Sequence, residues 1–297
     1  KIRGVIVPLL TPFDAAGRLD TEAMTRLVNF LISRGVSGLF PGGTTGEGPL
    51  LSMEERLALA EAVVAAADGR VPVIIHTGAI TTRETITLTR HARDIGAQAA
   101  AIIPPFYYRL SDDALFRHYE AVIEGVPDYP IYLYDNPAAS GNPLSPALTA
   151  RLVEAFPSLV GIKDSSGSLD KLAAATRWRE GTFNTASGSD GMVLAAGAIG
   201  VDACVSGNAN VVPELVVELH RAVRCHDLER ARTLQMTLNE VRTVLRDGAD
   251  LSLFKAMLSR RGLAVGAVRP PLLQASEEAI AACWQALNTL GVDLSPI

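Results

Sequence analysis

The stretch Ser158–Gly167, with the sequence SLVGIKDSSG, passes from an apolar run into a lysine and then into small polar residues. A continuous apolar run of this kind is typical of a strand that is buried on both faces of a parallel sheet. Lys163, at the end of the run, is one of only four lysines in the chain. An amine beside apolar groups loses hydration, which lowers its pKa and leaves it able to attack a carbonyl carbon. The alternative is a strand-end lysine whose amine reaches solvent.

The same order, an apolar run followed by a helical pattern, recurs along the chain. Ile2–Leu10 is the first apolar run, and the apolar residues of Leu19–Arg34 recur at helical spacing. Further strands are predicted at residues 38–40, 73–76, 100–103, 131–134, 159–163, 182–186 and 203–206. The helices after them are predicted to begin near Ser52, Thr82, Ser111, Ser145, Ser168, Ser189 and Val211. Most of these residues are Ser or Thr, which are favoured N-caps.

Eight consecutive strand-helix units, with strands too apolar for one face to be exposed, predict an α/β fold, the (β/α)8 or TIM barrel. We assign residues 1–225 to this catalytic barrel and residues 226–297 to a C-terminal helical region, with helices expected at 228–245, 251–260 and 275–290. The alternative is a doubly wound open sheet. A dinucleotide fold of that kind needs a G-x-G-x-x-G pattern after its first strand, and this chain has none there.

Composition narrows the class of function. The 297 residues are 48% hydrophobic and 20% charged, which is typical of a folded globular protein. The formal net charge of -5 and the lack of a basic block argue against nucleic acid as a partner and favour small molecules. No apolar run approaches the roughly 18 to 20 residues that cross a bilayer, so no membrane association is expected. Three distant cysteines favour a reducing compartment, and a cytoplasmic location is expected.

The loop Pro41–Gly48, with the sequence PGGTTGEG, follows the second strand. In a barrel of this kind the active groups lie at the C-terminal ends of the strands. The glycines allow backbone N–H groups to turn toward an anion, and Thr44 and Thr45 add hydroxyl donors. We therefore expect the loop to bind a carboxylate, although a plain turn would use the same glycines. It is not a Walker P-loop, because it lacks Gly-Lys-Ser/Thr.

Tyrosines follow two other strands. Tyr107 lies in the segment Pro104–Tyr108 after the fourth strand, and Tyr134 ends the fifth. Because the fifth strand is next to the one that ends at Lys163, the Tyr134 hydroxyl can reach the same substrate atom as the amine and relay protons there. The alternative for Tyr134 is a core ring with a satisfied hydroxyl.

Small polar residues also follow the last two strands. The segment Ser187–Gly191 contains Gly188 and Asp190 and opens a helix, whose N-terminus can accept a carboxylate or hydroxyl group of a substrate. Ser206–Asn208 has the same character after the eighth strand. The alternative is that Ser189 and Asp190 only cap the helix.

The histidines and cysteines do not indicate a metal site. The five histidines form no H-E-x-x-H pattern, and no pair of cysteines has ligand spacing. We therefore expect neither a metal nor a cofactor. An enzyme that forms a carbanion next to a carbonyl group still needs an electron sink, and a protonated imine on Lys163 supplies one.

Three motifs resemble those of the dihydrodipicolinate synthase and N-acetylneuraminate lyase family, a group of Schiff-base enzymes that handle pyruvate. The motifs are Gly43–Glu47, with Glu54 and Glu55 at the expected distance, Tyr134–Pro137 and Gly161–Ser165, in the right order and spacing. The resemblance covers essentially the whole chain. It implies a (β/α)8 barrel with a few C-terminal helices, assembled as a homotetramer of two tight dimers.

The resemblance also implies roles for individual residues. Lys163 would form the imine with pyruvate or another 2-oxo acid, and Tyr134 would shuttle protons. Thr44 and Thr45 would hold the carboxylate and tune Tyr134. Tyr107 would complete a proton relay, typically in the neighbouring subunit's site across the tight dimer.

The backbone near Val205 would also face the imine.

Two residues depart from the family pattern. Ala139 stands where the lysine-pathway synthases carry an arginine that binds the carboxylate of the aldehyde substrate, and Asn136 is polar where an apolar residue is more common. The segment Ala138–Gly141 looks closer to aldolases and dehydratases of 2-oxo-3-deoxy sugar acids and to sialic acid lyases, although Thr44 stands where those lyases usually carry serine.

The leading hypothesis is a metal-independent class I aldolase or lyase that acts through a Lys163 imine. Its expected substrate is a 2-oxo-3-deoxy sugar acid, split into pyruvate and an aldehyde, and dehydration of such an acid is a close variant. The alternative is 4-hydroxy-tetrahydrodipicolinate synthase, which condenses pyruvate with aspartate semialdehyde. A further alternative is a barrel that binds a 2-oxo acid without turning it over, but the retention of Tyr134, Thr45 and Lys163 argues against it.

Overall fold

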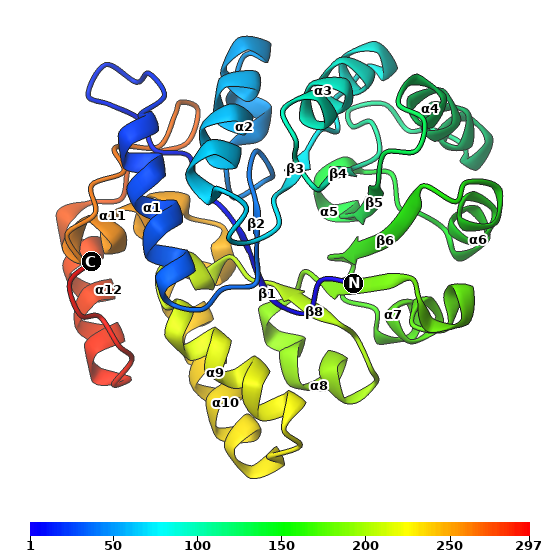
Figure 1. Ribbon diagram of the computed structural model, residues 1–297. Coiled ribbons are helices and arrows are strands. Elements are labelled where there is room, and N and C mark those ends of the chain that lie inside the picture. Colours follow the sequence, from blue (N-terminus) through cyan, green and yellow to red (C-terminus); the bar gives the residue numbers. More distant parts are fainter.

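The computed structural model describes residues 1–297 and contains one sheet of eight parallel strands in the order β2-β1-β8-β7-β6-β5-β4-β3. A parallel bridge between Leu39 and Val73 joins the two ends of this order, so the sheet closes into a barrel. Helices surround it (Figure 1). The predicted (β/α)8 fold is therefore confirmed. The strands are β1 Gly4–Pro8, β2 Gly38–Phe40, β3 Ile74–His76, β4 Ala99–Ile102, β5 Ile131–Asp135, β6 Leu159–Asp164, β7 Asn184–Ser187 and β8 Ala203–Val205.

Helices alternate with the strands, and side-chain caps fix where most of them begin. At the start of α2 the Ser52 hydroxyl accepts a hydrogen bond from the Glu55 backbone N–H, while the Glu55 carboxylate accepts one from the Ser52 N–H. The helices of the barrel are α1 Thr21–Ser33, α2 Met53–Ala67, α3 Thr82–Asp94, α4 Asp112–Gly125, α5 Pro137–Ser140, α6 Pro146–Ala155, α7 Leu169–Ala175, α8 Val193–Ala198 and α9 Pro213–Arg224.

One helix begins later than the sequence predicts. Near Ser189 the structure has a 3-10 turn over Asp190–Met192, and α8 begins only at Val193. The Ser189 side chain makes no capping bond. The Asp190 carboxylate accepts hydrogen bonds from the side-chain and backbone N–H groups of Asn208, so it is not available as a cap. The polar residues after β7 therefore bind the segment after β8 instead of starting a helix.

Three helices follow the barrel, as the sequence predicts. They are α10 Leu228–Val244, α11 Leu251–Arg260 and α12 Glu277–Thr289. Helix α10 packs along α9 and also contacts α12, and α12 contacts α11. None of the helices is both long enough and apolar enough to cross a membrane.

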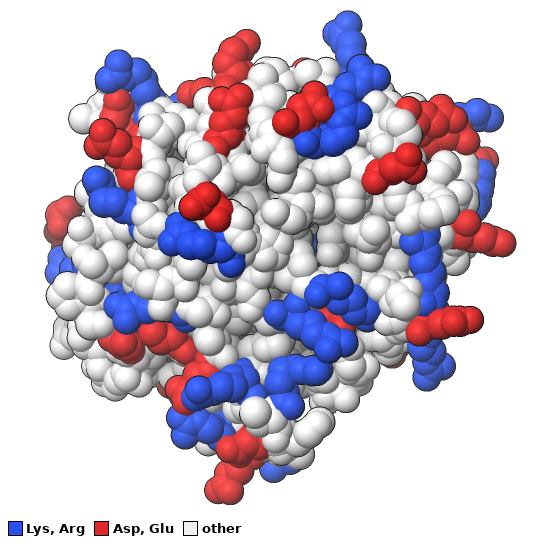
Figure 2. Space-filling model, viewed as in Figure 1, with Lys and Arg blue, Asp and Glu red and all other residues white.

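The N-terminus lies at the N-terminal ends of the strands, near the centre of the view in Figure 1. From this side, acidic and basic side chains are interspersed around the rim, and basic side chains gather near the N-terminus (Figure 2). Lys1 and Arg3 there lie within ion-pair distance of Asp202, with Lys1 Nζ 2.8 Å from the carboxylate. The charges of this face are thus partly paired within the chain.

Side chains of each strand alternate between the barrel interior and the layer beneath the helices. On β5, Tyr132 and Tyr134 belong to the interior cluster, whereas Leu133 belongs to the outer one. On β6, Ile162 belongs to the outer cluster, so the next residue, Lys163, faces the interior. The fold thus places a tyrosine and a lysine in the same apolar interior, at the C-terminal ends of adjacent strands.

Candidate active site

Lys163 and Tyr134 lie side by side on two neighbouring strands. They are direct register partners on β6 and β5. Lys163 is 6% exposed and Tyr134 2% exposed. The Lys163 Nζ lies 3.8 Å from the centre of the Tyr134 ring and 4.2 Å from that of Phe40. The amine is therefore held between two aromatic faces, with the apolar surroundings that the sequence predicts for it.

The protonation states of this pair are shifted in complementary directions. Burial lowers the pKa of Lys163, although its attraction to Tyr134 opposes the shift. Burial alone would raise the pKa of Tyr134, but the Lys163 charge and hydrogen bonds from Thr44, Asn136 and Lys163 outweigh it, so the pKa of Tyr134 is lowered. A neutral amine is the form that attacks a carbonyl carbon, and a phenol whose pKa is lowered toward the working pH gives up its proton more readily and so can alternate between phenol and phenolate.

Two polar side chains contact the Tyr134 hydroxyl. The Thr44 hydroxyl approaches it from the loop after β2, and the Asn136 Nδ2 donates a hydrogen bond of 3.0 Å to it. Sequence reasoning noted Asn136 only as a departure from the family pattern and gave it no role. A signal was present, because residues i and i+2 of a strand share a face, so Asn136 starts on the same side of the chain as Tyr134.

A buried ion pair holds the loop that carries Thr44 and Thr45. Glu47, whose φ of 55° is left-handed, places one carboxylate oxygen 2.7 Å from the Lys255 Nζ of α11, and both side chains are fully buried. The other oxygen accepts a 2.8 Å hydrogen bond from the Arg269 backbone N–H. Burial lowers the pKa of Lys255, and Glu47 opposes that shift. The C-terminal region therefore anchors the loop from outside the barrel, a contact that sequence reasoning missed.

A pocket lies between this loop and the C-terminal region. Thr44 is exposed and Thr45 half-buried, and both line a pocket of about 370 Å³. The far wall of the pocket comes from the C-terminal region and includes Gly248, Ala249, Leu251, Pro271 and Leu272. The pocket thus lies between the loop and the C-terminal region, and neither Lys163 nor Tyr134 lines it.

Gly188 and Asp190 follow the end of β7, the strand that pairs with β6, which carries Lys163. Gly188 is required by space, because a Cβ there would lie 2.0 Å from the Ser165 Oγ. Asp190 is 9% exposed, and its Oδ1 has no hydrogen-bond partner. Burial raises the pKa of this carboxyl against hydrogen bonds from Ser206 and Asn208. The Asp190 carboxyl is thus buried and bound by the segment that follows β8.

Val205 lies close to Lys163 and Tyr134, whereas Tyr107 does not. Val205 ends β8 with its side chain in the interior cluster, next to the site. Tyr107 does not join the site of its own chain. It is 84% exposed, has a left-handed φ of 88°, and packs edge-on against Tyr108 with ring centres 5.1 Å apart. A role in a neighbouring subunit's site stays a prediction.

His76 is a further neighbour that sequence reasoning weighed only as a metal ligand. Its ring packs edge-on against Tyr134, with centres 5.8 Å apart. Burial, with the charges of Arg56 and Lys163, holds the pKa of His76 well below its usual range, so the imidazole is neutral. No group of three or more His, Cys, Asp or Glu side chains is arranged to hold a metal ion.

A buried amine beside a phenol of lowered pKa, with a hydroxyl-bearing loop at the same end of a (β/α)8 barrel, is the arrangement expected of a Schiff-base lyase. Comparison with known proteins gives the family. The chain belongs to the dihydrodipicolinate synthetase family, whose sequence profile matches residues 1–290.

Relatives and solved structures support this over nearly the full length. The 4-hydroxy-tetrahydrodipicolinate synthase of Methanopyrus kandleri is 36% identical, over 98% of this chain and 97% of that protein. The Escherichia coli K12 prophage protein YagE, of the dihydrodipicolinic acid synthase family and solved in complex with pyruvate, superposes with a TM-score of 0.92 at 33% identity, covering 98% of this chain and 99% of its own.

A third similarity extends to an aldolase. The Ruminococcus gnavus sialic acid aldolase, solved as a catalytic lysine mutant, gives a TM-score of 0.93 at 26% identity, covering 98% of this chain and 96% of that one. The family thus includes synthases and aldolases on one fold. This chain is a lyase of that family, and the predicted enzyme class is confirmed.

Proposed function

We propose that Lys163 forms an imine with the 2-oxo group of the substrate and that Tyr134 moves the protons. The observation that carries this proposal is the buried Lys163 amine, 3.8 Å from the centre of the Tyr134 ring and directly opposite it in register. Thr44 and Thr45 bind the substrate carboxylate. The pyruvate complex of YagE supports pyruvate as the 2-oxo acid unit.

The proton steps balance with these residues alone. Neutral Lys163 attacks C2, and water leaves with a proton from Tyr134, which gives a protonated imine and a phenolate. The Tyr134 phenolate then takes the proton of the C4 hydroxyl, and the C3–C4 bond breaks to an aldehyde and an enamine. Tyr134 returns the proton to C3. Hydrolysis of the imine releases pyruvate, restores the amine and leaves its proton on Tyr134.

The substrate that we favour is a 2-oxo-3-deoxy sugar acid. Ala139, exposed on α5, stands where a synthase would need an arginine. The Asn136 amide, beside the Tyr134 hydroxyl, offers a polar group for a hydroxyl of a sugar chain. The similarity to a sialic acid aldolase points the same way.

A substrate panel tests this assignment. We expect pyruvate release from one or more 2-oxo-3-deoxy sugar acids, measured with a coupled lactate dehydrogenase assay, to exceed condensation of pyruvate with aspartate semialdehyde by about 10²-fold or more in kcat/KM, because a missing carboxylate partner costs several kcal/mol. The Lys163→Ala variant is the blank. Efficient condensation with no sugar-acid cleavage would contradict the assignment.

The second candidate is the lysine-pathway synthase. It is favoured by the Methanopyrus kandleri relative and by Arg109, whose guanidinium donates to the Gly141 carbonyl at the end of α5 and so brings a cation close to Ala139. If condensation prevails in the panel, Arg109 is the residue to test as the aldehyde-carboxylate partner.

We also propose a cytoplasmic homotetramer in which Tyr107 completes a neighbour's site. The exposed, left-handed Tyr107 supports this. Tyr107→Phe and Lys163→Ala chains, each impaired alone, should regain activity when dissociated and reassembled together, because one mixed site then has both wild-type residues. Sedimentation gives the assembly size. No recovery of activity after confirmed mixing would show that Tyr107 does not act in a neighbour's site.

A further inference from the structure

An aspartate follows each of the two central residues. Asp135 follows Tyr134 and Asp164 follows Lys163, and the two aspartates are register partners at the ends of β5 and β6. Because side chains alternate along a strand, both carboxylates point away from the barrel interior. Both are buried, Asp135 at 0% exposure and Asp164 at 2%. Two carboxyl groups therefore lie side by side in buried surroundings, on the opposite face of the strands from Tyr134 and Lys163.

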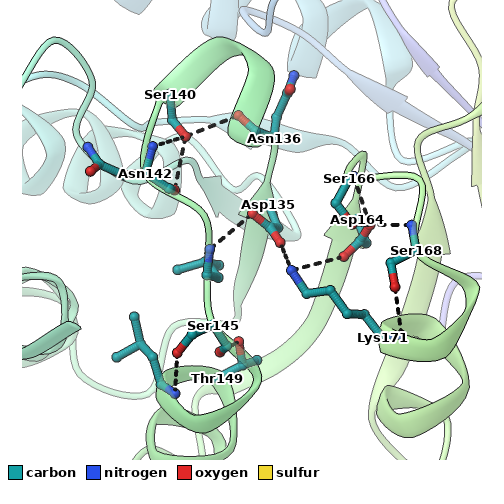
Figure 3. A network of polar contacts seen from close by, with 12 residues as sticks. Asp135, Asn136, Ser140, Asn142, Ser145, Thr149, Asp164, Ser166, Ser168 and Lys171 are labelled. Atoms are coloured by element: carbon teal, nitrogen blue, oxygen red, sulfur yellow. Dashed lines mark hydrogen bonds and ion pairs between the residues drawn. The ribbon is translucent and has the colours of Figure 1, made fainter. Parts of the chain in front are cut away.

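The same lysine lies close to both carboxylates. Lys171 projects from α7 and its Nζ forms an ion pair with Asp135 Oδ2 and lies 3.9 Å from Asp164 Oδ2. Figure 3 shows its amine pointing between the two aspartates. The Ser168 hydroxyl caps α7 by accepting from the Lys171 backbone N–H, which fixes where the lysine starts. Its side chain is only 22% exposed.

The remaining contacts of the aspartates are local. Asp135 Oδ1 accepts from the Leu144 N–H at 3.1 Å, and Asp164 Oδ1 accepts from both the N–H and the hydroxyl of Ser166. Asp164 Oδ2 has no hydrogen-bond partner, and Lys171 is the cation that lies close to it. The lysine is thus the group that connects the two carboxylates.

The backbone of the same two residues connects three strands. The Asp135 carbonyl accepts from the Ser165 N–H, and the Asp164 carbonyl accepts from the Gly188 N–H, each at 2.7 Å. Burial and the neighbouring Asp135 raise the pKa of Asp164, and Lys171 opposes this shift. Removing the lysine would leave two adjacent buried carboxyl groups without a cation, which costs free energy either through repulsion or through uptake of a proton. The strand ends would relax apart, and Tyr134 and Lys163, one residue away, would move with them.

We propose that Lys171 is a positioning residue: through Asp135 and Asp164 it holds the ends of β5 and β6 together, so that the Tyr134 hydroxyl and the Lys163 amine stay at reacting distance. This inference rests on the proposed imine chemistry of Lys163. The group Asp135, Asp164 and Lys171, here named the strand-end brace, touches no substrate and acts only through its neighbours.

The test measures imine formation, which needs both neighbours of the brace. Wild type and variants are mixed with pyruvate, trapped with borohydride at timed intervals, and the adduct on the Lys163 peptide is counted by mass. Lys171→Met should trap pyruvate on the order of ten- to a hundredfold more slowly, since small misplacements of reacting groups have effects of this size. Lys171→Arg keeps the charge and should stay close to wild type.

Two readouts separate positioning from a loss of folded protein. The end-point should still reach one pyruvate per folded chain, and half-saturation by pyruvate should stay unchanged, because Thr44 and Thr45 hold the carboxylate. Lys1→Met breaks a similar lysine–aspartate pair at the opposite end of the barrel and should leave the trapping rate unchanged. If Lys171→Met does not fold, Lys171→Met/Asp135→Asn removes one buried charge, keeps an acceptor for Leu144, and should trap at a rate between those of Lys171→Met and wild type.

The outcomes separate the positioning role of Lys171 from the imine chemistry of Lys163. If wild type traps pyruvate on Lys163 and Lys171→Met, or the double variant, traps equally fast, the positioning role is wrong while the imine stands. If the end-point falls but the rate per folded chain does not, the brace only stabilises the fold, and the proposal is also wrong. If wild type traps no pyruvate, the imine chemistry and the positioning role fall together.

Discussion

The Lys163→Ala variant is expected to lose turnover by about 10⁵-fold, because no other amine in the site can replace the nucleophile. The other lysines are engaged elsewhere: Lys171 with Asp135, Lys255 with Glu47 and Lys1 with Asp202. Turnover is measured by pyruvate release, and imine formation by borohydride trapping with peptide mass analysis. Wild type should give an adduct on the Lys163 peptide, and the variant should give none.

The same substitution should leave the protein folded, and its effect on stability has a sign that depends on pH. The pKa of Lys163 is lowered in the folded state, so between the lowered value and its ordinary value the unfolded chain binds more protons than the folded one. Wild-type stability therefore rises with pH across that window. Below it, the folded protein carries the full cost of a buried cation.

Lys163→Met, which fills the same space without a charge, should therefore be more stable than wild type near neutral pH, and the difference should shrink as pH rises. Denaturant titrations at several pH values measure this, and circular dichroism melts check the alanine variant. Lys1→Met is the control, since its amine is partly exposed. A collapse of the fold in both Lys163 variants would instead make the lysine structural.

The parts that sequence reasoning predicted share one property, which is that their signal is local. The barrel was predictable because each strand and helix has its own period and cap, as at Ser52 and Ser168. The proximity of Lys163 and Tyr134 could be predicted because parallel strands of a barrel bring their C-terminal ends to one rim. The turn that carries Thr44 could be predicted from the glycines around it.

The parts that were missed depend on partners far away in the chain. Glu47 meets Lys255 across more than two hundred residues, and Lys171 meets Asp135 across 36. Contacts between residues so far apart in the sequence produce no periodic pattern from which they could be predicted. The late start of α8 has the same origin, because Asp190 binds Asn208 and not its own helix. A polar residue directly after a strand is thus ambiguous until its partner from another strand end is known.

The Tyr134→Phe variant should lower kcat by about 10²- to 10⁴-fold, the usual range for loss of a proton-transfer group. The phenyl ring keeps the packing against Phe40 and His76, so the fold and the contact with Lys163 should persist. Borohydride should still trap pyruvate on Lys163 in this variant, but more slowly, since proton donation to the departing water is lost. An undiminished kcat would exclude Tyr134 as the proton shuttle.

The neighbours of Tyr134 give this prediction a pH dependence. Imine formation needs the protonated phenol, so the rate should fall as pH rises through the lowered pKa of Tyr134. Asn136→Ala removes a hydrogen bond that favours the phenolate, which should raise that pKa and move the alkaline limb of kcat to higher pH. Ala138→Ser, in the short helix α5 that Asn136 caps, is the control and should leave the limb in place. The alkaline limb should be absent in Tyr134→Phe, because the group that titrates is gone. If the limb persists there, another group controls the alkaline side, and the shift in Asn136→Ala must then have a different cause.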